Sequence, residues 1–227
     1  MDQRLKNNFK LAAQMLGLLR ATPALIQYRV GSIFMDKNRA FSLAAESVAK
    51  VPGLVGTYAR YAFYKQTLAH CGKDVCFGFM SIISKRDTRI GDKAYIGRHV
   101  SIGLADIAHS VLLSDNVQIL SGRHHHGSEA DADIQSKPLK YNRVILGSST
   151  WVGANCVIMN NVGRNSIVGA GSVVVKPVKP HDKVVGVPAR SVKTVPKSKA
   201  APNATSKPKP QPQPKSDTPK LKLRRAA

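Results

Sequence analysis

The sequence predicts a mainly β protein in which a three-sided parallel coil follows a helical region and precedes a disordered basic tail. Apolar residues at helical spacing indicate helices within residues 1–74. Apolar and small residues paired at six-residue intervals indicate the coil over residues 75–192, with a loop over residues 122–143. Seven prolines and ten basic residues, without an aromatic ring, indicate disorder over residues 193–227.

The N-terminal region begins with a stretch that is typical of an amphipathic helix. One helix is expected over residues 5–20. Its apolar positions are Leu5, Phe9, Ala12, Leu16 and Leu19. The segment over residues 11–19 also resembles a signal peptide, but Gln14 and Gly17 interrupt it. The helix is therefore favoured over a cleaved signal.

A second helix is expected over residues 41–50, with breaks after it at Pro52-Gly53 and Gly56. An aromatic cluster in a basic surrounding follows: Tyr58, Tyr61, Phe63 and Tyr64. These rings can cap the end of the coil, or contact a lipid-linked substrate or the bilayer interface. The sequence has no apolar run of about eighteen residues, so no transmembrane span is expected. We expect a cytoplasmic protein, and peripheral contact with the inner face of the membrane stays open.

Apolar and small residues recur together at six-residue intervals from Phe77 onward. The pairs that set the phase are Ile90-Gly91, Ile96-Gly97 and Ile102-Gly103. A six-residue unit is too short for a hairpin, but it fits one flat side of a three-sided coil. Each side directs one aliphatic residue inward and places a small residue at the corner, where a Cβ atom would crowd the turn. Burial of the aliphatic column is expected to stabilise the coil.

The spacing is irregular at three places. One residue is missing before Ile107, and the repeat stops after Gly122 and resumes at Leu146. Two further residues are missing between Ile158 and Val162. The spacing on both sides of each irregularity indicates a single array.

The charge favours an anionic partner. The net charge is +22, and the residues before the tail retain +13, from 25 basic and 12 acidic residues. Nucleic acid, an anionic membrane or a phosphorylated small molecule would suit this charge. No base-reading module is recognisable, so no specific nucleic acid is expected. Cys71, Cys76 and Cys156 include no CxxC pair, so neither a disulfide framework nor a four-cysteine zinc site is indicated.

The segment from Ile90 to Arg190 resembles the hexapeptide-repeat acyltransferases, which include galactoside, maltose, xenobiotic and serine acetyltransferases. The most specific stretch is Val144 to Arg190, with its W-V-G-A, G-A-G-S-V-V, K and G-V-P-A-R elements. The resemblance implies a left-handed parallel β-helix, an exception to the usual right-handed crossover. It also implies a homotrimer with active sites between subunits, and acetyl-CoA as acyl donor. The short step between Ile158 and Val162 and the long helical N-terminus depart from the family pattern.

The loop supplies the candidate for catalysis, because it carries His124, His125 and His126. Acyl transfer from a thioester needs a base of near-neutral pKa to take the acceptor's proton, and histidine suits this task. In the resembling family the catalytic histidine follows the last coil before the loop, in strings of the type T-x-T-H or S-G-x-H, and residues 121–124 match the second type. The resemblance therefore selects His124, with His126 as a substrate contact and fallback base. The loop acids Glu129, Asp131 and Asp133 receive no role.

A run of three histidines also suggests a metal site, and the γ-class carbonic anhydrases share the implied fold. Ligand rings must converge on a metal, whereas adjacent residues of an extended segment point to opposite sides. The sequence has no H-x4-H repeat on consecutive coils. We therefore expect no metal.

The resemblance also assigns a donor site. It implies that Ala154 and Ala170 offer backbone amides to the pantetheine arm, and that Val175, Lys176 and Arg190 approach the nucleotide phosphates. The coil needs small corner residues whatever it binds, so alanine at these two positions does not distinguish a donor site from an ordinary corner. Trp151 is expected beside the acceptor, although packing between subunits explains it equally well.

These features predict an acetyl-CoA-dependent O-acetyltransferase acting on a hydroxyl of a sugar, polysaccharide or lipid-linked saccharide. An N-acetyltransferase of an amino sugar or small molecule and a non-catalytic β-helix scaffold are the alternatives. A nucleic-acid-binding protein driven by the tail is a further class, and its binding should weaken steeply with salt.

Overall fold

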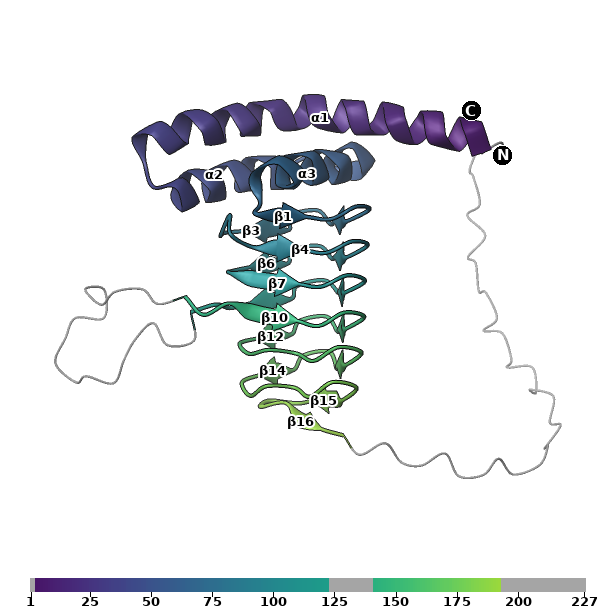
Figure 1. Ribbon diagram of the computed structural model, residues 1–227, viewed down its shortest axis with the longest axis vertical. Helices are drawn as coiled ribbons and strands as arrows, with labels where there is room; N and C mark the ends of the chain where they lie inside the picture. The colour runs from purple at the N-terminus through teal and green to yellow at the C-terminus, as the bar shows by residue number, and fades with distance from the viewer. Residues whose placement is uncertain (1–2, 123–140, 193–227) are drawn as a thin grey trace, which may run out of the picture. The chain divides into compact units, whose positions relative to one another are not determined.

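The computed structural model describes residues 3–122 and 141–192, with side chains from Leu11 onward. The chain begins with the helices α1 (Gln3–Phe34), α2 (Lys37–Ala49) and α3 (Gly53–Thr67) and continues as a coil of short strands (Figure 1). Most of the loop and the tail over residues 193–227 lie outside the described residues. None of the described helices combines the length and the apolar composition that a membrane crossing requires.

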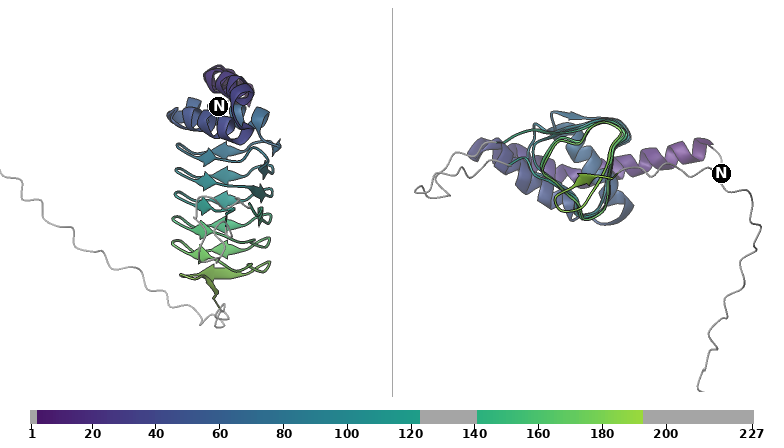
Figure 2. Two further views of the ribbon diagram at one scale, coloured as in Figure 1. Left: turned by 90° about the vertical axis from the view of Figure 1, so that its left-hand side faces the viewer. Right: turned by 90° about the horizontal axis from the view of Figure 1, so that it is seen from below.

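The coil is a left-handed parallel β-helix with three sheets, which confirms the predicted fold class (Figure 1). Seen along its axis, the coils superpose as a rounded triangle (Figure 2). The first sheet contains, in order, β1 (His70–Cys71), β4 (Arg89–Ile90), β7 (Ala105–Ile107) and β10 (Val144–Leu146). The second contains β2 (Cys76–Phe77), β5 (Tyr95–Ile96), β8 (Leu112–Leu113), β11 (Trp151–Val152), β13 (Ile167–Val168), β15 (Lys183–Val185) and the antiparallel β16 (Arg190–Ser191). The third contains β3 (Ile82–Ile83), β6 (Ser101–Ile102), β9 (Gln118–Ile119), β12 (Val157–Ile158) and β14 (Val173–Val174).

The expected roles of aliphatic and small residues are confirmed. The second residue of each two-residue parallel strand is buried, and these side chains form one continuous column. At the corners, glycine lets successive coils approach: a Cβ atom on Gly97 would lie 2.6 Å from the backbone carbon of Ser114. The turns use left-handed backbone, as at Lys93 and His99 with φ of 57° and 54°.

All irregular steps fall at one corner, where the chain passes from the third sheet to the first; we call it the third corner. The step between buried residues is seven from Ile83 to Ile90, five from Ile102 to Ile107 and four from Ile158 to Val162. The short step keeps Val162 in the first sheet, where it bridges Leu146 and Val178. The loop leaves at this same corner, between β9 and β10 (Figure 1).

The helix boundaries differ from the expectation. The first helix continues past residue 20 to Phe34 and contains Pro23, because Ala21 and Ala24 bury against the other helices and this packing outweighs the hydrogen bond that proline cannot donate. The second begins at Lys37, since the Asp36 side chain caps it by accepting from the Asn38 and Arg39 amides at 3.0 Å.

The expected break at Pro52-Gly53 is present, since α2 ends at Ala49 and α3 begins at Gly53, but the expected break at Gly56 is wrong, because Gly56 lies within α3. Pro52 is the N-cap residue of this helix. Gly56 lies inside the helix for a steric reason: a Cβ atom there would lie 1.9 Å from the Val51 carbonyl oxygen. The first strand, β1, also precedes the expected start of the coil at residue 75, because Cys71-Gly72 already forms an apolar–small pair.

The three helices form a cap on the first coil. Tyr64 is fully buried; its hydroxyl donates to the Ser81 carbonyl at 3.4 Å and accepts from the Ile83 amide at 3.1 Å. Phe63 is buried beside it, with ring centroids 5.3 Å apart, and the Tyr61 hydroxyl donates to the Gly72 carbonyl. Of the two alternatives for the aromatic cluster, Phe63 and Tyr64 therefore follow the first and cap the end of the coil, because both are fully buried.

Candidate functional site

The described residues at both ends of the loop meet in a narrow neck at the third corner. The Asn142 amide donates to the Ser121 carbonyl at 2.7 Å, so the chain leaves the coil and returns at one place. The Val144 amide then donates to the Leu104 carbonyl and restarts the first sheet. The histidines predicted from the sequence, His124 and His126 with His125 between them, lie outside the described residues.

Arg143 holds the returning side of the neck. Its Nη1 donates to Asp106 Oδ1 at 2.6 Å and to the Asp87 carbonyl at 2.9 Å. Lys85 Nζ lies 3.8 Å from the centre of the Tyr141 ring, a cation–π contact across the same neck. The returning strand is therefore bound to the two coils before it, those of β7 and β4.

A hollow of about 160 Å³ opens beneath the neck. Asn160 and Asn161, in the shortened step before Val162, line this hollow. Asn161 Oδ1 accepts from the Ile145 amide at 2.9 Å, and Asn160 Nδ2 donates to the Val175 carbonyl at 3.1 Å. The hollow is lined by Leu120, Ser121, Asn142, Arg143, Val144, Met159, Asn160 and Asn161.

Sequence reasoning did not identify this hollow. The only signal was a pair of asparagines at a shortened step, which by itself resembles an ordinary polar turn.

Ala154 and Ala170 lie in stacked turns between the second and third sheets. The Gly171 amide donates to the Ala154 carbonyl at 2.8 Å, and a Cβ atom on Gly153 would lie 2.5 Å from the Ala170 nitrogen. The two alanines are thus neighbours on one corner.

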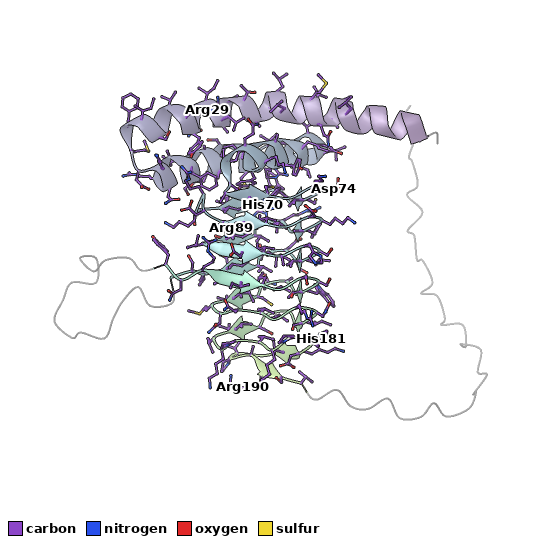
Figure 3. The ribbon with its side chains drawn as sticks, viewed as in Figure 1. Arg29, His70, Asp74, Arg89, His181 and Arg190 are labelled. Atoms are coloured by element: carbon purple, nitrogen blue, oxygen red, sulfur yellow. The ribbon has the colours of Figure 1, made fainter. Side chains whose placement is uncertain are left out.

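Lys176 and Arg190 line one hollow of about 260 Å³ on the last coil. Lys179 adds a third cation there, and Asp182 is the acid among the lining residues. The Asp182 carboxylate accepts from the Lys183 amide and from the Ser191 hydroxyl. Figure 3 shows Arg190 at the end of the coil opposite to α1. The basic pair predicted for phosphate contact therefore converges in a cationic hollow.

Trp151 stands outward on the second sheet with 51% of its surface exposed. Its indole Nε1 donates to Ser114 Oγ at 3.4 Å. Leu112 pairs with it in the neighbouring strand, and Tyr95 pairs with Leu112 in turn. These three exposed side chains form an apolar ladder, so Trp151 is one member of a larger surface.

The predicted site residues thus fall into separate groups within one chain. The alanines lie at one corner, while Val175 and Lys176 lie at the third corner. Trp151 lies on the face of the second sheet, and the loop histidines lie beyond the described neck.

The remaining reactive groups are structural. Burial raises the pKa of the Cys71 thiol to about 11 and also raises the pKa of Cys156. His99 and His181 occupy corner turns with positive φ. Among residues 3–122 and 141–192, no cluster of three metal-ligating side chains occurs.

Comparisons with known proteins show which proteins this chain is similar to. No protein-family model matches the chain. The chain is similar to galactoside O-acetyltransferase of Escherichia coli (strain K12), with 32% identity over 93 residues, which cover 39% of this chain and 43% of that protein. It is also similar to the putative lipopolysaccharide biosynthesis O-acetyl transferase WbbJ of the same strain, with 28% identity over 127 residues, covering 52% and 62%. The chain thus spans about half the length of these curated relatives.

Solved structures show the same fold. A maltose O-acetyltransferase from Clostridium difficile 630 matches with a TM-score of 0.62 and 22% identity, covering 69% of this chain and 85% of that one. A hexapeptide-repeat acetyltransferase from Vibrio cholerae, solved with acetyl coenzyme A, matches with a TM-score of 0.57 and 23% identity, covering 65% and 80%. These comparisons confirm the resemblance predicted from the sequence: the chain is similar to O-acetyltransferases over part of their length and has the hexapeptide-repeat fold.

Proposed function

We propose that this protein transfers an acyl group, acetyl in the simplest case, from acyl-CoA to a hydroxyl of a sugar, polysaccharide or lipid-linked saccharide. The observation that carries the proposal is the similarity of the chain to O-acetyltransferases, together with the cationic hollow at Lys176 and Arg190. Because acyl-CoA is a cytoplasmic metabolite, we place the proposed reaction in the cytoplasm.

His124 is the proposed general base. It follows Gly122 by two residues, and two extended residues span about 7 Å, so it is tethered to the neck of the loop. Its imidazole takes the proton of the acceptor hydroxyl while the oxygen attacks the thioester carbonyl. The tetrahedral intermediate collapses, the carbon–sulfur bond breaks, and the imidazolium returns its proton to the leaving thiolate. The mechanism requires no acyl-enzyme.

The donor site is built from the other predicted residues. Lys176 and Arg190 suit the phosphates of coenzyme A, because both are exposed cations in one hollow. Val175 lies beside them, and its carbonyl is held by Asn160. The stacked turns of Ala154 and Ala170 suit an extended pantetheine chain. No step of the proposed mechanism uses a metal.

A homotrimer would bring these separated groups together. Within one chain the loop neck, the alanine corner and the apolar ladder lie on different corners and faces. The ladder of Tyr95, Leu112 and Trp151 is a suitable subunit contact, since exposed apolar side chains in a row mark interaction surfaces. We infer that each site forms between two subunits, with Trp151 and His126 beside the acceptor.

The test measures thiol release from acetyl-CoA against a panel of sugars, lipid-linked saccharides and amino sugars. His124→Ala should lower kcat by about 10²- to 10⁴-fold, as loss of a general base does, while His125→Ala serves as the matched control. An unchanged rate in His124→Ala would refute the assignment, and a loss confined to His126→Ala would transfer the role to His126. Turnover of amino sugars alone would replace the hydroxyl acceptor by an amine.

A further inference from the structure

Helix α1 is apolar on the side that faces away from the rest of the protein. Seven large apolar residues follow one another there at helical spacing, and we call them the outer stripe: Leu11, Met15, Leu18, Leu19, Ile26, Val30 and Ile33. Met15, Leu19 and Ile33 are 67%, 69% and 76% exposed. At about 1.5 Å per residue the stripe is about 33 Å long.

The opposite side of α1 shows that its orientation is set by packing. Small residues cover that side, and Ala13, Ala21 and Ala24 are buried against α2 and α3. Gly17 permits the closest approach, since a Cβ atom there would lie 2.4 Å from Tyr58 Cβ. Leu25 is also buried on this side, whereas the large side chains of the outer stripe stay outside.

The outer stripe lies on the end of the molecule. α2 and α3 separate α1 from the coil, and α1 runs across them (Figures 1 and 2). Side chains project from α1 away from the other helices, and Arg29 lies among them (Figure 3). An apolar row this long on an end face marks a contact with an apolar medium or partner.

The charge of α1 decides whether this contact is with an apolar medium or with a protein partner. Residues 3–34 contain five basic residues and no acidic one: Arg4, Lys6, Lys10, Arg20 and Arg29. Pairing of this helix with a second copy of itself would bring cations together without a neutralising acid. Anionic lipid headgroups attract such a helix, and the acyl region beneath them takes up the large apolar side chains.

We propose that α1 docks this protein on an anionic membrane surface, with the outer stripe buried at the boundary between headgroups and acyl chains. The docking uses residues different from the aromatic cluster of α3, which is packed on the coil. It does not depend on the proposed acyl transfer.

The experiment measures co-sedimentation of the full chain with vesicles of phosphatidylglycerol and phosphatidylcholine in equal parts, and with pure phosphatidylcholine. Salt at about 1 M reduces the Debye length to about 3 Å and suppresses purely electrostatic binding, including any by the basic tail. Wild type should prefer the anionic vesicles and remain partly bound at 1 M salt. The triple variant Met15→Gln, Leu19→Gln, Ile26→Gln should bind the vesicles at least about tenfold more weakly than wild type. Salt at about 1 M should release it completely.

The control is Leu54→Gln, which replaces a leucine on α3 that is 55% exposed and should bind as wild type does. Retention of the triple variant at the wild-type level would overturn the proposal, as would complete release of wild type by salt. A fall in molecular mass of the triple variant with unchanged vesicle binding would assign the stripe to a second copy instead.

A second readout tests insertion directly. The fluorescence of Leu19→Trp should be quenched by brominated acyl chains, whereas that of Leu54→Trp should not; equal quenching of the two would contradict docking through α1. The triple variant should keep its kcat/KM on a water-soluble acceptor, so loss of docking and absence of acyl transfer are separate outcomes.

Discussion

Arg60 shows how one residue joins the helical cap to the coil. It is 1% exposed, and its described hydrogen bonds all go to backbone carbonyls. Nε donates to Phe77 at 3.1 Å, and Nη1 donates to Val51 at 2.7 Å and to Ala49 at 3.3 Å. Burial lowers the pKa of Arg60, and the three carbonyls offset the cost of its desolvation.

Replacing Arg60→Met should therefore destabilise the protein by about 2–4 kcal/mol, because three buried carbonyls lose their donor. Urea denaturation followed by circular dichroism measures this change. The control Arg98→Met alters an exposed arginine and should change stability by less than about 0.5 kcal/mol. Equal stabilities of the two variants would show that Arg60 does not tie the cap to the coil.

At the scale of the element, the third corner combines every irregular step with the loop. The other corners repeat at six residues and stack closely through glycine, whereas the third corner varies in length from coil to coil. A variable corner can release a loop without disturbing the column of buried side chains. The neck is then held by the Asn142–Ser121 hydrogen bond and by Arg143.

Arg143→Gln should lower kcat about tenfold while changing the free energy of unfolding by less than about 1 kcal/mol, since its partly exposed ion pair contributes little to stability. The KM for acetyl-CoA should stay unchanged, because Arg143 does not line the cationic hollow of Lys176 and Arg190. Steady-state kinetics measures both parameters.

The control for the neck is Arg89→Gln, which removes an exposed arginine from the same sheet two coils earlier. Arg143→Lys should recover part of the lost rate by restoring the ion pair. A loss of stability that accounts for the whole loss of activity would show that Arg143 acts on folding and does not position the loop.

At the scale of the whole molecule, the two ends and the sides of the coil have different surfaces. The outer stripe of α1 lies at one end, the cationic hollow at the other, and the apolar ladder along the second sheet between them. In the proposed homotrimer the ladder is the surface that joins the subunits.

Leu112→Arg should separate the subunits, because it places a charge in the middle of the ladder. Light scattering should give the mass of one 24.5 kDa chain for the variant and about three times that mass for wild type. Activity should fall in parallel, since each site needs two subunits. Leu54→Arg, on the cap, should keep both the mass and the activity of wild type, and an unchanged mass for Leu112→Arg would exclude the ladder as the subunit contact.

Much of the fold was predictable from the sequence, because the coil depends on local spacing. Inward aliphatic residues such as Ile96 and corner glycines such as Gly97 recur at short fixed distances, so periodicity reveals them. The cationic pair Lys176 and Arg190 was found through motif position, and the structure brings it into one hollow. His124 rests on its motif alone.

The tertiary structure decided what depends on contacts between distant residues. It showed that all irregular steps share one corner, and that Arg60 and Tyr64 tie the cap to the first coil. It also showed that α1 continues through Pro23 and leaves the large apolar residues of the outer stripe outside. Local pattern determines which residues are apolar, but only packing decides which apolar face is covered, because a helix with two apolar faces can bury either one.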